Sequence, residues 1–172
     1  MVWFDAHGDV HTLATSTSGY LGGMALRMAM GGDASKLAGP LGIRPLPEDR
    51  TILVDARDLD PAEGAYLATS GVRRRAVAEI QAEDLPDGPV ILHLDVDVID
   101  PAEVPGLRFP APGGPSRSAV LEAVRRLVST DRVSILDVAC PWLEPADDDQ
   151  QRVRRALLTE LLNCRLPGRP HG

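Results

Sequence analysis

Asp5-Ala-His7-Gly-Asp9 and Asp95-Val-Asp97 each follow an apolar run and place carboxylate or imidazole side chains at alternate positions. Residues two apart in an extended strand share a face, so the paired side chains point the same way at the strand's C-terminal end. Two such strand ends side by side form a cage for a divalent cation. Open α/β sheets bind their ligands at this edge, where parallel strands end.

The types and spacing of these five side chains indicate the metal. Carboxylate and imidazole ligands suit Mn²⁺ or a similar cation better than a thiolate-preferring one. Four residues of strand cover about 13 Å, so the chain must bend after His7 for Asp5 and Asp9 to reach one ion. Gly8 can adopt the backbone conformations of such a bend. The five ligands could bridge two ions, a pairing that activates water. We therefore expect one or two Mn²⁺ ions per chain and metal-activated hydrolysis.

Strand and helix patterns alternate along the chain, which indicates a parallel sheet covered on both faces. Apolar runs predict strands near residues 2–4, 51–55, 90–97 and 133–138. Periodic apolar positions predict helices over residues 21–30, 63–68, 74–81, 116–128 and 149–164. Ser116 is expected to cap the fourth of these helices. We expect a single domain over residues 1–165 and a flexible tail over residues 166–172.

Composition and charge narrow the class of protein. The chain has 172 residues, 44% hydrophobic and 25% charged, an ordinary composition for one globular domain. Its net charge of −7 argues against a nucleic-acid partner. The one basic run, residues 73–75, is interpreted as the start of a solvent-facing helix. No apolar stretch approaches the ~20 residues of a membrane helix, and no secretory signal is recognisable. We expect a cytoplasmic protein with a small-molecule substrate and reduced cysteines.

The motifs DAHGD at residues 5–9 and LDVDVIDPAEVPG at residues 94–106 resemble the two manganese-binding motifs of the ureohydrolase family, which comprises arginase, agmatinase and formiminoglutamase. Segments 15–20, 57–61 and 112–116 extend the resemblance over nearly the whole chain. It implies a three-layer α/β/α fold with a mainly parallel sheet, hydrolysis of a guanidino or formimino C–N bond, and a possible homo-oligomer. The metal ligands that it implies are Asp5, His7, Asp9, Asp95 and Asp97. The substrate loop would contribute Ser16, Ser18 and Tyr20.

The sequence departs from the family at its start. The N-terminal strands of the family and their metal-binding Gly-Gly-Asp-His segment are absent, which implies an N-terminally truncated domain. By resemblance, one metal keeps its ligands Asp5, His7, Asp95 and Asp97. The other metal keeps three carboxylates and lacks its imidazole. His93 precedes Asp95 by two residues and so faces the same side, which makes it a candidate extra ligand or a group that orients one.

The sequence also departs from the family in the substrate pocket. Tyr20 and Gly22 occupy the positions of an asparagine and a proton-shuttling histidine in the arginases. Cys140 stands where the family has a glutamate that pairs with a guanidinium, and a thiol cannot make that charge-assisted contact. Arginine and agmatine are therefore disfavoured as substrates. His11, with an unperturbed pKa of about 6.5, is a candidate replacement proton carrier.

These observations favour a metal-dependent hydrolase that cleaves the C–N bond of a guanidino, amidino or amide-like small molecule, with Asp9 and His11 as catalytic residues. Two alternatives stay open: a non-catalytic relative that binds metal, and an inactive truncated product. Asp95-Val-Asp97 alone also suggests an aspartyl-phosphate phosphotransferase. Such an enzyme would want a lysine downstream of the motif, whereas the only lysine, Lys36, lies upstream.

Overall fold

The computed structural model describes residues 1–33, 35–36 and 38–164, so the tail expected over residues 166–172 lies outside the described residues. Five strands form one sheet in the order β3-β2-β1-β4-β5, and every neighbouring pair is parallel. The strands are β1 (Val2–Asp5), β2 (Ile52–Asp55), β3 (Arg73–Arg75), β4 (Val90–Asp95) and β5 (Val133–Ala139).

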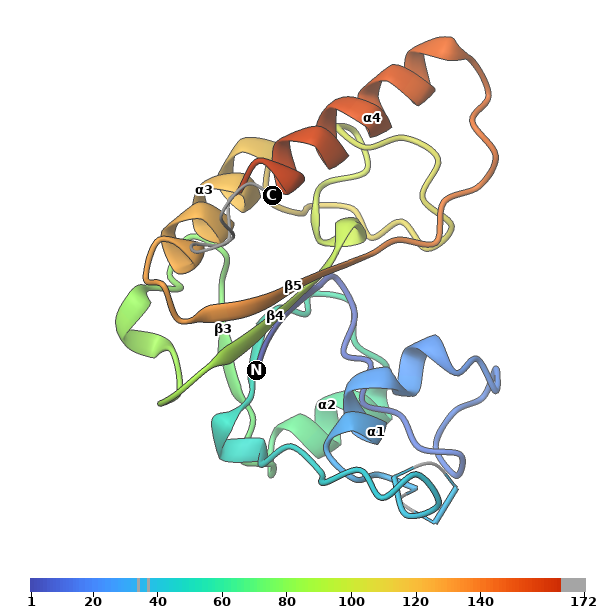
Figure 1. Ribbon diagram of the computed structural model, residues 1–172. Coiled ribbons are helices and arrows are strands. Elements are labelled where there is room, and N and C mark those ends of the chain that lie inside the picture. Colours follow the sequence, from blue (N-terminus) through green and yellow to red (C-terminus); the bar gives the residue numbers. More distant parts are fainter. Residues whose placement is uncertain (34, 37, 165–172) are drawn as a thin grey trace.

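Helices lie on both faces of this sheet (Figure 1). Phe4 packs into the core shared with α3 (Arg117–Val128) and α4 (Asp148–Leu162), whereas Trp3 packs on the opposite face with α1 (Ala25–Ala29) and α2 (Pro61–Leu67). All four residues of β1 are buried, as expected for a central strand of a parallel sheet. The three-layer α/β/α architecture expected from the sequence is confirmed.

Side-chain caps fix where three of the helices begin. The Ser116 hydroxyl accepts a hydrogen bond from the Ala119 amide at 3.2 Å, which confirms Ser116 as the N-cap of α3. Asp147 caps α4 in the same way through the Gln150 amide at 2.8 Å. Asp60 and Glu63 form a capping box at the start of α2, where Pro61 is the first helical residue.

The structure corrects several element predictions. The helix expected over residues 74–81 is wrong: residues 73–75 form the edge strand β3, and Arg75 pairs with Asp84. The strand expected over residues 90–97 ends at Asp95. The helix expected over residues 21–30 is divided into a 3-10 turn and the short α1. The 3-10 turns are η1 (Gly22–Met24), η2 (Glu48–Arg50), η3 (Ala82–Asp84) and η4 (Val96–Val98).

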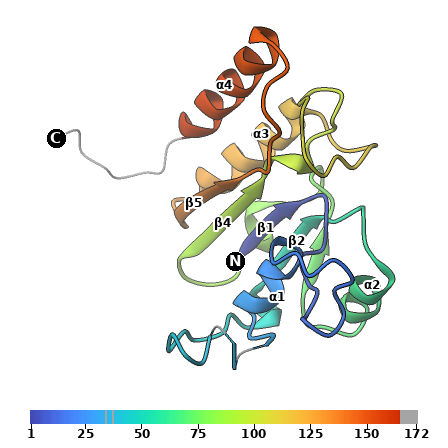
Figure 2. The same cartoon turned by 90° about the vertical axis from the view of Figure 1, so that its right-hand side faces the viewer.

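The parallel arrangement brings the C-terminal ends of the strands to one edge of the sheet. The loops that follow β1 and β4, which are neighbours in the sheet, lie at the same end (Figure 2). The two ligand motifs begin at the last residues of β1 and β4 and continue into these loops, so the fold itself places them together. Within the described residues, no helix is long and apolar enough to cross a membrane.

Candidate metal centre

Asp5 is the last residue of β1 and lies in the centre of the site with only 1% of its surface exposed. The Trp3 indole Nε1 donates a hydrogen bond to Asp5 Oδ2 at 3.1 Å. The His7 backbone amide donates to Asp5 Oδ1 at 2.7 Å, which curls the chain as it leaves the strand. These two donors hold the carboxylate in one orientation.

The bend that brings Asp9 back toward the site differs from expectation. Asp9 has a φ of +53°, and Gly8 is absent from the residues of positive φ. Gly8 is instead needed for close packing, because a Cβ there would lie 2.7 Å from Glu63 Oε1 and 2.9 Å from Leu59 Cδ2. The left-handed conformation at Asp9 makes the turn, and a short aspartate tolerates it better than most side chains do.

Asp95 and Asp97 come from the end of β4 and the 3-10 turn that follows. Asp97 lies outside the strand, so its side chain reaches the site because the backbone curls rather than because the strand alternates. The Asp97 amide donates to Asp95 Oδ1 at 2.9 Å, and the Ala6 amide donates to Asp97 Oδ1 at 3.2 Å. The second contact ties the two motifs together.

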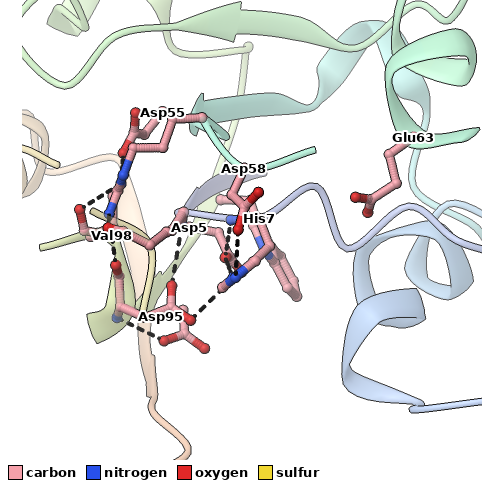
Figure 3. A network of polar contacts seen from close by, with 12 residues as sticks. Asp5, His7, Asp55, Asp58, Glu63, Asp95 and Val98 are labelled. Atoms are coloured by element: carbon pink, nitrogen blue, oxygen red, sulfur yellow. Dashed lines mark hydrogen bonds and ion pairs between the residues drawn. The ribbon is translucent and has the colours of Figure 1, made fainter. Parts of the chain in front are cut away.

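His7 connects the carboxylates of the two motifs. Its Nδ1 lies 3.3 Å from Asp5 Oδ1 and 3.2 Å from Asp97 Oδ2. One ligand atom from each of Asp5, His7 and Asp97 lies within 4.8 Å of the others, a spacing that a single cation can fill. Hydrogen bonds to Asp5 and Asp97 raise the pKa of His7 to about 11. Asp5, His7 and Asp95 lie close together, with Asp58 beside His7 (Figure 3).

Asp9 and Asp95 complete the acidic lining of the site. Burial, followed by the negative charge of Asp5, raises the pKa of Asp9 to about 9. Burial, followed by the charges of Asp97 and Asp5, raises the pKa of Asp95 to about 8. Ionising all four carboxylates around one imidazole would create excess negative charge, which a bound divalent cation would neutralise. The donor set therefore fits a hard or borderline divalent metal.

A pocket of about 480 Å³ opens over these residues and is also lined by the expected substrate-loop residues Ser16, Ser18 and Tyr20. The two serine hydroxyls accept loop hydrogen bonds from the amides of Gly19 and Tyr20, at 3.0 and 3.2 Å respectively. The Tyr20 ring lies 5.2 Å from the Phe109 ring, between ring centroids. The loop thus presents hydroxyl groups and an aromatic ring to the pocket.

His11 lines the same pocket and lies in a second cluster of polar side chains. Its Nε2 lies 3.0 Å from Asp60 Oδ2, and its Nδ1 lies 3.1 Å from the Thr15 hydroxyl. Glu63 Oε2 lies 4.0 Å from His11 Nε2. The sequence singled out His11 but did not identify Asp60 and Glu63 as pocket residues. Asp60 lies in the turn motif at residues 57–61, whereas Glu63 follows that motif in the first turn of α2.

His93 and Cys140 occupy the pocket on the side of β4 and β5. His93 Nδ1 lies 2.6 Å from Asp137 Oδ2, and the His93 ring stacks on Trp3 with centroids 3.6 Å apart. Burial, and then the charges of Asp95 and Asp97, raises the pKa of the Cys140 thiol well above its usual range. Cys140 therefore faces the pocket as a neutral thiol, which argues against a nucleophilic role.

Arg57, which precedes α2, holds the loops around the site, a role that the sequence analysis did not predict. It pairs with Asp55 and donates to the carbonyls of Asp97 at 3.2 Å and Val98 at 3.0 Å. A Cβ at Gly114 would lie 2.6 Å from an Arg57 nitrogen, which explains the glycine there. Arg57 thereby fixes the backbone that carries Asp97.

Comparisons with known proteins agree with this geometry. The chain is 30% identical over 167 residues to an N(omega)-hydroxy-L-arginine amidinohydrolase of Streptomyces lavendulae. The matched region covers 94% of the chain and 58% of that protein. It is 35% identical over 128 residues to an arginase of Bacillus subtilis, and this matched region covers 66% of the chain and 43% of the relative. A crystal structure of Bacillus subtilis arginase superposes with a TM-score of 0.82 at 28% identity and covers 99% of the chain.

The family of this chain follows from the protein-family model that its sequence matches. The chain spans 62% of the length of that crystal structure and about half the length of the curated relatives, so it corresponds to part of their fold. The family model described as "Arginase family" matches residues 1–164, which include both ligand motifs and all five strands. This chain belongs to the arginase family, the ureohydrolases.

Proposed function

We propose that this chain carries the metal centre of a Mn²⁺-dependent hydrolase that cleaves the C–N bond of a guanidino, amidino or amide-like small molecule other than arginine. One observation carries the proposal. Four carboxylates and an imidazole from two strand ends, Asp5, His7, Asp9, Asp95 and Asp97, line one pocket of about 480 Å³. Membership of the arginase family supports this chemistry.

The proposed ligand sets divide these side chains between two ions. Asp5, His7, Asp95 and Asp97 would hold one Mn²⁺ ion, and Asp5 and Asp95 would share a second ion with Asp9. A divalent cation held there supplies Lewis acidity and lowers the pKa of water to about 7. Asp58 Oδ2 lies 3.9 Å from His7 Nε2 and would help to fix the imidazole orientation.

The remaining pocket residues would handle the proton and the substrate. Asp9 faces the centre of the site and would orient the attacking water or take its proton. His11, in contact with Asp60, would carry that proton toward the leaving nitrogen. Ser16, Ser18 and Tyr20 would contact the substrate at the pocket mouth through their hydroxyl groups.

The neutral thiol of Cys140 bears on the choice of substrate. It cannot supply the bidentate, charged contact that a guanidinium requires. The printed name of the Streptomyces lavendulae relative adds N-hydroxyguanidino compounds to the substrate classes worth testing. Hydroxylation makes a guanidine less basic, so an uncharged form of such a compound is compatible with a neutral thiol.

The test is a turnover panel with the Mn²⁺-loaded chain. Release of ammonia, urea or hydroxyurea would be measured from arginine, an N-hydroxyguanidine, a formamidine and a primary amide, with Asp97→Ala as the matched control. We expect the unchanged protein to turn over at least one uncharged compound and to turn over arginine more slowly. We expect no turnover of any compound by Asp97→Ala. Equal turnover by both proteins would refute the proposed site.

The principal alternative is a non-catalytic relative that binds metal, and Cys140 in the pocket is the observation that favours it. The same panel separates the two functions. A chain that binds Mn²⁺ stoichiometrically and releases none of these products from any compound would be a metal-binding protein without this activity. A chain that neither binds metal nor folds stably would be an inactive product.

Cellular location and assembly stay predictions of the sequence. We expect the protein in the cytoplasm, with a small molecule as its ligand and with self-association possible. Fractionation and sedimentation of the expressed protein would test both expectations.

A further inference from the structure

We propose that His93 is the imidazole ligand of the second metal ion and acts there with Asp5, Asp9 and Asp95. This inference rests on the proposed metal-dependent function and goes beyond it, since it assigns a ligand from β4 that the ligand motifs do not contain. It predicts two ions per chain, each with one histidine: His7 for the first and His93 for the second.

The position of His93 in β4 places it on the same face of the sheet as the carboxylates of the site. His93 pairs in register with Trp3 of β1. Asp95 lies two residues beyond His93, and Asp5 lies two residues beyond Trp3, so all four side chains share one face of the sheet. His93 is only 7% exposed and lines the same pocket as Asp5, Asp9 and Asp95.

The contacts of His93 leave one ring nitrogen for a ligand. Its Nδ1 lies 2.6 Å from Asp137 Oδ2, and this carboxylate holds the hydrogen on Nδ1. Its Nε2 has no hydrogen-bond partner among the residues that the structure describes. A histidine whose Nδ1–H is bound by a carboxylate presents its Nε2 in a fixed orientation, the usual arrangement of a metal-binding histidine. Stacking on Trp3, with an interplanar angle of 20°, further fixes the ring.

The other pocket imidazole that could serve the second ion is His11, and its contacts argue against it. Both of its ring nitrogens already have partners: Nε2 lies 3.0 Å from Asp60 Oδ2, and Nδ1 lies 3.1 Å from the Thr15 hydroxyl. Freeing Nε2 for a metal would also disturb Asp60, which caps α2. Binding through His93 requires neither change.

The carboxylates also fit two ions better than one. Asp5, His7 and Asp97 form a compact group around one position, and Asp9 and Asp95 lie outside that group although they line the same pocket. Four ionised carboxylates balance the charge of two divalent cations. A single ion held by the group of Asp5, His7 and Asp97 would leave the carboxyls of Asp9 and Asp95 in the pocket without a metal to bind.

The first experiment measures metal content. The chain and its variants His93→Phe and His11→Gln would be loaded with Mn²⁺, freed of excess metal and analysed for Mn per chain. Phenylalanine keeps an aromatic ring to stack on Trp3 and removes both ring nitrogens, the proposed ligand Nε2 and the Nδ1 that contacts Asp137. We expect two ions in the unchanged protein and in His11→Gln, and one in His93→Phe. Magnetic coupling between paired Mn²⁺ ions in the electron paramagnetic resonance spectrum should disappear in His93→Phe alone.

The outcomes separate this inference from the proposed function. If the unchanged chain binds one ion and His93→Phe binds the same ion equally well, the role of His93 is refuted while the metal site stands. Two coupled ions in His93→Phe would refute it as well. If the unchanged chain, shown to be folded by circular dichroism, binds no metal, the proposed function itself fails and the role of His93 fails with it.

A second variant tests the carboxylate behind His93. Asp137→Asn keeps the shape of the side chain and weakens its hold on the Nδ1–H, so Asp137 acts as a positioning residue. We expect the affinity for the second ion to fall roughly 10- to 100-fold, with the first ion unaffected. Unchanged affinity for both ions would contradict the pairing of Asp137 with a ligand histidine.

Discussion

Cys140 is the residue whose environment most changes what the pocket can bind. The thiol is partly buried, and the charges of Asp95 and Asp97 oppose formation of its thiolate. A raised pKa means that the thiol form persists through neutral and moderately alkaline pH. In the folded protein we therefore expect alkylation by iodoacetamide at pH 8 to be at least tenfold slower than in the unfolded chain. Mass spectrometry of a Cys164→Ser variant, in which Cys140 is the only cysteine, measures this rate. Equal rates would contradict the environment described.

Replacing Cys140 with glutamate should convert the pocket toward guanidinium binding. A carboxylate at this position can make charge-assisted hydrogen bonds to a guanidinium, each worth about 1.5–3 kcal/mol. With metal bound, we expect the affinity for arginine to rise by about tenfold or more in Cys140→Glu, measured by calorimetry. Cys140→Gln, which adds similar volume without charge, is the control and should change little. A rise of the same size in the glutamine variant would show that charge is not the cause.

At the residue scale, the sequence predicted the centre of the site and missed its surroundings. Asp5 and Asp95 could be identified because each ends an apolar strand, and the end of a strand has a fixed place in a parallel sheet. Asp60 and Glu63 have no such pattern. They reach the pocket only because the turn before α2 folds back beside the loop that carries His11. A long-range contact of this kind leaves no periodic signal in a single sequence.

At the scale of the elements, the caps and strand ends fix the framework on which the site is built. The Ser116 hydroxyl satisfies the Ala119 amide at the start of α3, which packs on the sheet. Ser116→Ala should lower the free energy of unfolding by about 1 kcal/mol, because one amide at the helix start loses its partner. Urea denaturation followed by circular dichroism measures the change. Thr17→Ala, at an exposed position, is the control, and equal stability of both variants would contradict the role of the cap.

The edge strand β3 shows why one element could not be predicted from the sequence. Residues 73–75 are three arginines, a composition typical of an exposed helix surface, yet they form the edge strand β3. Their placement depends on partners distant in the sequence: Arg73 donates to the Asp84 carbonyl at 2.7 Å, and Arg74 donates to the Ala56 carbonyl at 2.9 Å. Parallel pairing with β2 supplies backbone hydrogen bonds along one side of β3. Tertiary contacts therefore override the local pattern.

For the whole molecule, metal binding and folding should be strongly coupled. The acidic side chains of the site are buried and repel one another, and a bound cation removes that repulsion. A ligand that binds only the folded state adds about 2.7 kcal/mol of stability at a concentration 100 times its Kd. We expect the thermal midpoint to rise by several degrees with Mn²⁺ and to fall again with a chelator. A midpoint indifferent to both additions would indicate that the pocket holds no metal.

The most direct test of the metal centre is the Mn²⁺ content of the chain compared with that of Asp97→Ala. Asp97 is buried, belongs to the compact ligand group with Asp5 and His7, and receives the Ala6 amide that joins the two motifs. Elemental analysis after removal of free metal should give two ions in the unchanged protein and at most one in Asp97→Ala. The same metal content in both proteins, or none in the unchanged protein, would contradict the assignment of this pocket as a metal centre.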